Sequence, residues 1–155
     1  MTLEQQVPPA GSGSRRDPAP ERFDPPYGRL FGWSVQRRGA QSFLALEKGI
    51  CAVTLPKLSA GPVIARLAAT GCAGPALVIP TRRGPHVAVL AEIDGLIPPR
   101  SALPEDVEVL AWGALLPLPV QARQDAAAEW LTAPDPRQRW LPGLDAVLAG
   151  ISARR

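Results

Sequence analysis

The apolar residues of this chain come in short runs, each ended by proline, glycine or a charged residue. With 19 prolines and 14 glycines among 155 residues, the chain has no apolar run near the roughly 18 residues that a membrane-spanning helix needs. Short apolar runs bounded by turn residues are typical of β-strands. Because 46% of the residues are hydrophobic, such strands can bury a core of their own. The pattern predicts a strand-rich domain with no membrane partner.

Several apolar runs are expected to form strands, because they are short and rich in Val, Ile and Leu. Two of these runs, 107–112 and 114–120, look like a further strand pair that is broken at Gly113. A later stretch, 121–131, is ambiguous, since its alanines favour a helix while its end, Glu129-Trp130-Leu131, could close a sheet. In chain order the expected strands are 42–47, 50–56, 76–80, 86–93, 107–112 and 114–120.

Two other segments carry helix signals. In 58–71 we expect Ser59 to cap the helix, Pro62 to lie in its first turn and Gly71 to end it. In 142–151 the apolar residues form one stripe at helical spacing, which predicts a short amphipathic helix. The residues of that stripe are Leu144, Val147, Leu148 and Ile151.

The first 26 residues differ in composition from the rest of the chain. They hold six prolines, small polar residues and charges of both signs. Such a segment buries too little apolar surface to offset its ordering entropy, so residues 1–26 are expected to be a disordered arm. After Tyr27, the order strand, strand, helix and then mostly strands predicts a single α+β domain over 27–155. Its sheet is expected to be largely antiparallel, with few helices.

Charge and cysteine content exclude few functional classes for this protein. The N-terminus lacks the apolar core of a signal peptide, which predicts a cytoplasmic protein. In that compartment Cys51 and Cys72 are expected to be reduced, largely buried thiols rather than a disulfide or a metal site. Apart from Lys48 and Lys57, all of the 17 Lys and Arg residues are arginine. Arginine suits phosphate recognition, but it is also the cation that GC-rich codons specify, so nucleic-acid binding stays open.

Three stretches, taken in order, carry a family resemblance. Residues 49–71 are similar to a segment in which a strand ends in an Asp-x-Asp pair and leads into a helix. Residues 81–90 are similar to a Thr/Ser-Gly-Gly-x-His strand. Residues 107–119 are similar to an Asp-Val-Arg…Gly…Val-Ala-Pro-Pro segment, and 129–131 to the Tyr-Arg-Trp that follows it. Over roughly 30–141 the chain therefore resembles the N-terminal domain of bifunctional DNA primase/polymerases (prim-pol), in particular small stand-alone actinobacterial members.

The resemblance implies a primase-polymerase-like fold, but the metal ligands of the family are missing. Nucleotidyl transfer in the family uses two divalent metals, held by the Asp-x-Asp pair and a third acid. This chain has Thr54-Leu55-Pro56 at the pair and Glu108 at the third acid. One carboxylate cannot hold two magnesium ions. We therefore expect a pseudoenzyme without polymerase activity and without a cofactor, where Mg²⁺ or Mn²⁺ would matter only for residual activity.

The histidine of the family motif is retained. In the family it contacts the nucleotide phosphate, and here it is His86, behind Thr81 and Gly84, with Arg83 in place of one glycine. His86 and Glu108 are the remnant positions of the catalytic site. A hydrogen-bonded, half-buried histidine beside a solvated turn would explain the same residues without any ligand.

A rival alignment places the acidic pair at Glu92 and Asp94. It leaves too few residues before Glu108 for the helix and the histidine strand of the family, and it puts His86 upstream of the acids. A solvated strand end is the preferred explanation of these two acids.

Two classes of function follow. The first is a pocket that binds a nucleotide or single-stranded nucleic acid through Thr81, Arg82, Arg83, Gly84 and His86, with Glu108 beside it. The second is a protein-interaction or regulatory module that uses the arm or the C-terminal helix. Five acids between residues 92 and 108, against a single arginine, favour the second class on that side of the domain. Stacking on tryptophan would favour the first, and Trp140 is the expected surface candidate among Trp33, Trp112, Trp130 and Trp140.

Overall fold

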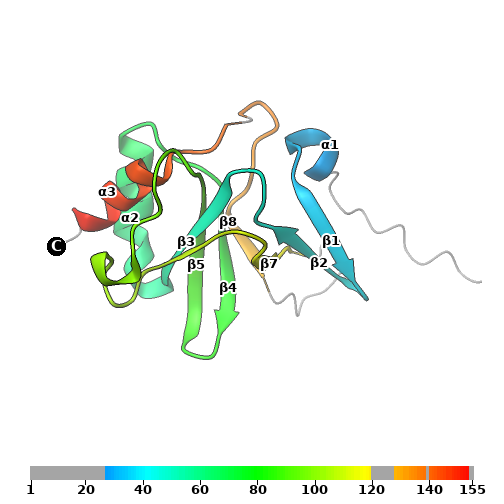
Figure 1. The fold of residues 1–155 in the computed structure, drawn as a ribbon, viewed down its shortest axis with the longest axis horizontal. Helices are drawn as coiled ribbons and strands as arrows, with labels where there is room; N and C mark the ends of the chain where they lie inside the picture. The colour runs from blue at the N-terminus through cyan, green and yellow to red at the C-terminus, as the bar shows by residue number, and fades with distance from the viewer. Residues whose placement is uncertain (1–26, 120–127, 139, 154–155) are drawn as a thin grey trace, which may run out of the picture.

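The computed structural model describes residues 27–119, 128–138 and 140–153. These residues form helices on one side of a five-stranded sheet and a smaller three-stranded sheet on the other side (Figure 1). All strand pairs within both sheets are antiparallel, so the expected α+β fold with a mostly antiparallel sheet is confirmed. The arm predicted for 1–26 and most of the ambiguous stretch 121–131 lie outside the described residues.

The larger sheet has the strand order β6-β3-β5-β4-β8. Its centre is formed by β3 and β5, which pair over the whole length of β3. The end of the ambiguous stretch, Glu129–Thr132, forms the edge strand β8 and thus closes this sheet. The five strands are β3 (Ile50–Pro56), β4 (Ala76–Thr81), β5 (Gly84–Glu92), β6 (Glu108–Leu110) and β8.

Two helices cover one face of the larger sheet, α2 (Lys57–Ala69) and α3 (Leu144–Ser152) (Figure 1). Side chains alternate between the two faces of a strand, so Cys51, Val53 and Leu55 of β3 all point to this helical side. All three are fully buried there. The predicted apolar stripe of the C-terminal helix is confirmed and packs into the same core through Leu144, Val147, Leu148 and Ile151.

The opposite face of the larger sheet is covered by the three-stranded sheet and α1 (Tyr27–Phe31). Ala52 of β3, Ala88 and Leu90 of β5 pack there against leucines of the smaller sheet. This second core includes a cluster of aromatic rings in contact with one another. Its members are Tyr27, Phe31, Trp33 and Trp130. The smaller sheet has the order β1 (Ser34–Arg38), β2 (Gln41–Ala45) and β7 (Leu115–Pro117).

The expected pairing of 107–112 with 114–120 is wrong. β6 pairs with β3 in the larger sheet, whereas β7 pairs with β2 in the smaller one. A tight turn at Trp112 and Gly113, with φ of +49° and +88°, redirects the chain from one sheet to the other. Each of the two strands makes its backbone hydrogen bonds with a single strand that is distant in sequence, which no local pattern could predict.

The start of α2 differs from the prediction and its end agrees with it. The helix begins directly after β3, with Pro56 at the N-cap position and no side-chain cap. Ser59 is therefore in the first turn rather than at the cap, and Pro62 lies inside the helix. At the other end Gly71 takes a φ of +75°, and the amide of Cys72 donates to the carbonyl of Leu67 at 2.8 Å. This is the Schellman arrangement that glycine favours after a helix.

None of the helices in the described part of the chain is long and apolar enough to cross a membrane. Cys51 is buried and Cys72 is half-buried, and both are free thiols.

Candidate functional site

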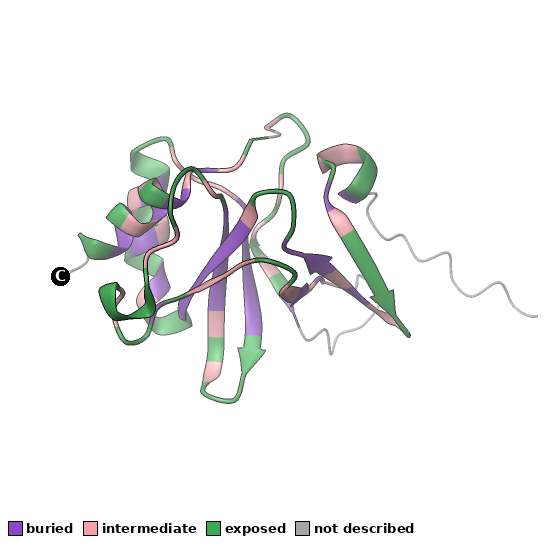
Figure 2. Cartoon of the chain, viewed as in Figure 1, coloured by how far each residue is buried: buried purple, intermediate pink, exposed green. Residues whose placement is uncertain are grey.

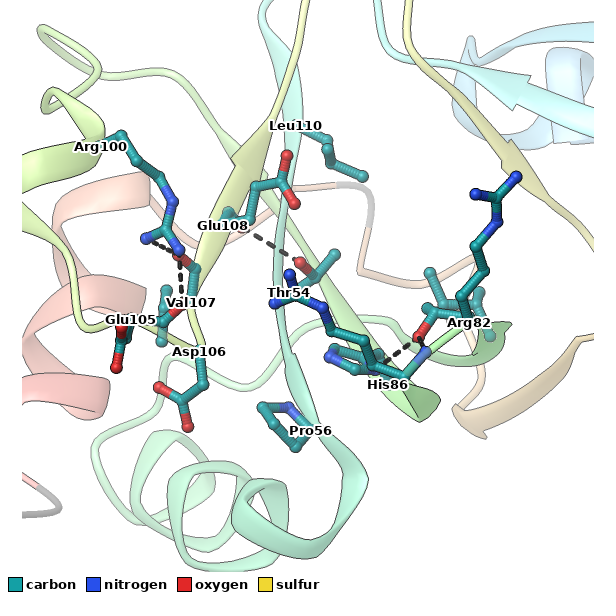
Figure 3. Close-up of a pocket in the computed structure, with 13 residues that line it drawn as sticks. Thr54, Pro56, Arg82, His86, Arg100, Glu105, Asp106, Val107, Glu108 and Leu110 are labelled. Carbon is teal, nitrogen blue, oxygen red and sulfur yellow. Dashed lines mark hydrogen bonds between the residues drawn. The ribbon is translucent and has the colours of Figure 1, made fainter.

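The smaller sheet covers only part of its face of the larger sheet, and a pocket of about 550 Å³ occupies the uncovered end. Strand register explains which side chains reach it. Thr54 lies opposite Glu108, and Pro56 lies opposite His86, so all four point to the same face of the sheet. Ile79 lies opposite His86 from the other side and completes the floor of the pocket. Figure 3 shows Thr54, Glu108 and His86 around the same opening.

The first wall of the pocket is the tip of the β4–β5 hairpin, which is exposed (Figure 2). The hydroxyl of Thr81 organises this tip: it donates to the carbonyl of Gly84 at 2.7 Å and accepts from the amide of Arg83 at 3.1 Å. Gly84 has a φ of +102°, a conformation that other residues rarely adopt. The turn holds two adjacent exposed arginines, Arg82 and Arg83, at the edge of the pocket.

The hydrogen bonds of His86 determine which ring atom is available to a ligand. Its Nδ1 lies 3.1 Å from the carbonyl oxygen of Gly84 and 3.1 Å from the hydroxyl of Thr81. A carbonyl oxygen can only accept, so Nδ1 carries the proton and donates. Nε2 has no hydrogen-bond partner among the described residues. It is therefore the ring atom left for a ligand in the pocket.

The second wall carries acidic residues on the segment before and at the start of β6. Arg100 holds this segment together, because its guanidinium donates to the carbonyls of Val107 at 2.7 Å and of Glu105 (Figure 3). It also donates to the carbonyl of Pro104 at 2.9 Å. Three of its five N–H donors are used by the backbone, so Arg100 has a structural role in this segment. The acidic side chains that line this wall are Glu105, Asp106 and Glu108.

Thr54 is the one buried polar side chain in the pocket floor, with 6% of its surface exposed. Its hydroxyl makes a single hydrogen bond within the described residues, to the backbone carbonyl of Glu108 at 3.4 Å. Bonds between two oxygens are ordinarily about 2.7–2.8 Å long, so this one is weak. A buried hydroxyl with a weak partner has unused capacity for a ligand.

The residues present do not fit the two metals of the prim-pol reaction. The positions that would carry the acidic pair hold Thr54 and Pro56, and Glu108 is the one carboxylate beside them in the sheet. In residues 27–119, 128–138 and 140–153, no group of three or more His, Cys, Asp and Glu side chains is arranged to hold a metal ion. What the pocket offers instead is a basic wall, an acidic wall and a polar floor.

The residues predicted for the site come together around one pocket. Thr81, Arg82, Arg83, His86 and Glu108 all line it, and Gly84 shapes the turn behind them.

The structure divides the acidic stretch into two groups. Glu92 is at the far end of β5, where it pairs with Ile50, and it is exposed, as is Asp94. These two acids lie at a solvated strand end, away from the pocket, as the preferred explanation expected. Only the acids from Glu105 onward face the arginines, so the stretch does not form one continuous acidic surface.

Trp140 was expected to be the tryptophan with a surface role, and it is 52% exposed. Trp112 is more exposed, at 81%, which the sequence did not indicate. Sequence reasoning also missed Arg100 and the hydroxyl of Thr54. A lone arginine in an acidic, proline-rich loop was the available signal for Arg100, but its backbone partners follow only from the folded loop.

The fold and the pocket together define an α+β domain with a polar site at the open end of its main sheet. No family model, no curated protein and no solved structure matches this chain.

Proposed function

We propose that this chain is a catalytically degenerate prim-pol-like domain that binds the phosphate of a nucleotide or of single-stranded nucleic acid. One observation carries the proposal. The three stretches that resemble prim-pol motifs supply the floor and both walls of one pocket, because β3 lies between the strand of His86 and the strand of Glu108. The resemblance implies that these three stretches serve a single site, and the pairing of β3 with β5 and with β6 supports this proposal.

The basic wall is suited to phosphate. Arg82 and Arg83 are adjacent in an exposed turn, where guanidinium groups can bind phosphate oxygens in pairs. His86 is the third side chain with nitrogen donors at the pocket, and its Nε2 atom can donate to a phosphate when the ring is protonated. Binding in this mode needs no metal and no carboxylate pair.

Polymerisation is not part of the proposal. The two-metal mechanism needs carboxylates that bridge both ions, and Thr54 and Pro56 supply none. We expect the purified protein to extend no primer with Mg²⁺ or Mn²⁺ above a heat-denatured control. Metal-dependent extension would overturn the assignment as a pseudoenzyme.

Fluorescence anisotropy of a labelled single-stranded oligonucleotide tests phosphate binding. The wild type should bind, and binding should weaken markedly between about 50 and 200 mM salt because phosphate contacts release counterions. Arg83→Ala and His86→Ala should each weaken binding, the former by about tenfold, since hydrogen bonds to charged groups are the stronger ones. Arg38→Ala is the matched control, because Arg38 is an exposed arginine on β1 that does not line the pocket.

Equal losses for Arg38→Ala and Arg83→Ala would show that binding follows overall charge rather than the pocket. No binding by the wild type would overturn the proposal.

A protein-interaction module is the second candidate, and exposed apolar side chains favour it. Leu58 and Leu96 are 98% and 92% exposed, and Trp112 is 81% exposed. The apolar stripe of α3 is buried against the sheet, so this helix does not offer that face to a partner. Salt-insensitive capture of a protein that Trp112→Ala abolishes would support this second function over the first.

A further inference from the structure

We infer that the pocket reads the base of its ligand as well as the phosphate, and that it selects guanine. This inference rests on the proposed phosphate binding at the hairpin. It comes from the opposite side of the pocket, where a carboxylate and a weakly bonded hydroxyl lie next to one another.

The two sides are separated by a distance that suits a single nucleotide. Glu108 on β6 and His86 on β5 are two strands apart, with β3 between them. Their partners on β3, Thr54 and Pro56, differ by two positions, so strand spacing places the two α-carbons roughly 12 Å apart. A nucleotide in an extended conformation separates its phosphate from its base edge by a similar length. A pocket of about 550 Å³ also has the size that small-molecule sites have.

Thr54 and Glu108 present a defined hydrogen-bond pattern. They lie opposite each other in neighbouring strands, so their side chains are adjacent on the pocket face. The carboxylate of Glu108 offers two acceptors and has no hydrogen-bond partner among the described residues. The hydroxyl of Thr54 can donate, and its bond of 3.4 Å to the Glu108 carbonyl holds it weakly.

Guanine complements this pattern better than the other bases. On its Watson–Crick edge N1–H and the N2 amino group are two adjacent donors, which match a carboxylate, and O6 is an acceptor for the Thr54 hydroxyl. Adenine offers one amino donor beside one acceptor and so makes fewer of these bonds. Uracil places a carbonyl oxygen toward the second carboxylate oxygen, and cytosine places the lone pair of ring N3 there, so each is repelled.

Hypoxanthine provides the sharpest comparison, since it differs from guanine only by the missing N2 amino group. Calorimetric titration at low salt should show that GMP binds about tenfold more tightly than IMP, because the amino group makes a charge-assisted bond. AMP and CMP should bind no better than IMP. Ribose 5-phosphate, which has no base, measures the contribution of the phosphate wall alone.

Glu108→Gln should reduce the preference for GMP over IMP to less than about threefold. Binding of ribose 5-phosphate should not weaken, because the substitution removes a negative charge that repels the phosphate. Glu92→Gln is the matched control, because it removes the same charge from an exposed acid at the far end of β5. It should leave the GMP preference unchanged. A circular-dichroism spectrum and a melting curve of each variant show that it folds.

The outcomes separate this inference from the proposed function. If all four nucleotides and ribose 5-phosphate bind alike and Arg83→Ala weakens them alike, phosphate binding stands and guanine selection is wrong. If GMP is preferred but Glu108→Gln does not change the preference, the carboxylate of Glu108 is not the group that selects guanine. If neither these ligands nor the oligonucleotide binds, both the inference and the proposed function are overturned.

Discussion

The two faces of β3 behave differently although they belong to the same seven residues. On the helical side Cys51, Val53 and Leu55 are all fully buried, and α2 and α3 cover them from end to end. On the other side the residues change from Ala52 in the second core to Thr54 and Pro56 in the pocket. One face is uniformly apolar, and the other becomes polar where the smaller sheet no longer covers it.

This difference indicates a division of roles within one strand. Burial by two helices removes the apolar face from water, so its side chains contribute mainly to stability. The smaller sheet is too short to cover the opposite face completely, and at the uncovered end polar groups from three neighbouring strands line the pocket. Alternation along a strand thus places a stabilising residue and a pocket-facing residue at consecutive positions, Leu55 and Thr54.

The largest expected effect is on the helical face. Leu55→Ala should lower the free energy of unfolding by about 2–5 kcal/mol, because it removes a fully buried side chain and leaves a cavity. Urea denaturation followed by circular dichroism measures this change. If the variant does not fold, Val53→Ala tests the same face with a smaller truncation. A loss below about 1 kcal/mol for both variants would show that the helices do not seal this face.

The reactivity of the two thiols sharpens the comparison. Burial, and to a smaller extent the charge of Asp94, raises the pKa of the Cys51 thiol from its ordinary value of 9.0 to about 11. At about pH 8 this lowers the thiolate fraction about 100-fold, and the thiolate is the reactive form. Iodoacetamide should therefore label half-buried Cys72 and leave Cys51 unmodified in the folded protein, as mass spectrometry of peptides would detect. Labelling of both at similar rates would contradict a sealed helical face.

The smallest expected effect on stability is at the pocket floor. Thr54→Val keeps the shape of the side chain and removes a hydroxyl whose one bond is long. Its free energy of unfolding should change by less than about 1 kcal/mol, although the residue is as deeply buried as the core. Binding of GMP should weaken about threefold or more, because the proposed contact between the Thr54 hydroxyl and O6 of guanine is lost. A large loss of stability would instead make Thr54 a structural residue.

Local signals in the sequence determined much of this molecule. The apolar runs on either side of the turn at 81–85 predicted β4 and β5 as strands, and Gly71 predicted the end of α2. The apolar stripe from Leu144 to Ile151 predicted α3. These features succeed because each depends on residues within one or two turns of chain. The basic wall of the pocket lies within one such short segment, residues 81–86. The sequence alone could therefore predict that these residues belong to one site.

Tertiary structure decided where separate segments meet. Strand pairing assigns β6 and β7 to different sheets, and the three carbonyl bonds of Arg100 shape the acidic wall. The pocket itself exists because the smaller sheet covers only part of the larger one. Each of these features depends on hydrogen bonds or packing between residues that are distant in sequence, or on the folded course of a loop, and no local pattern encodes them. The sequence alone determined the turn at Arg82 and Arg83 and the strand that carries His86, whereas only the folded chain brought Glu108 and Thr54 to the same pocket.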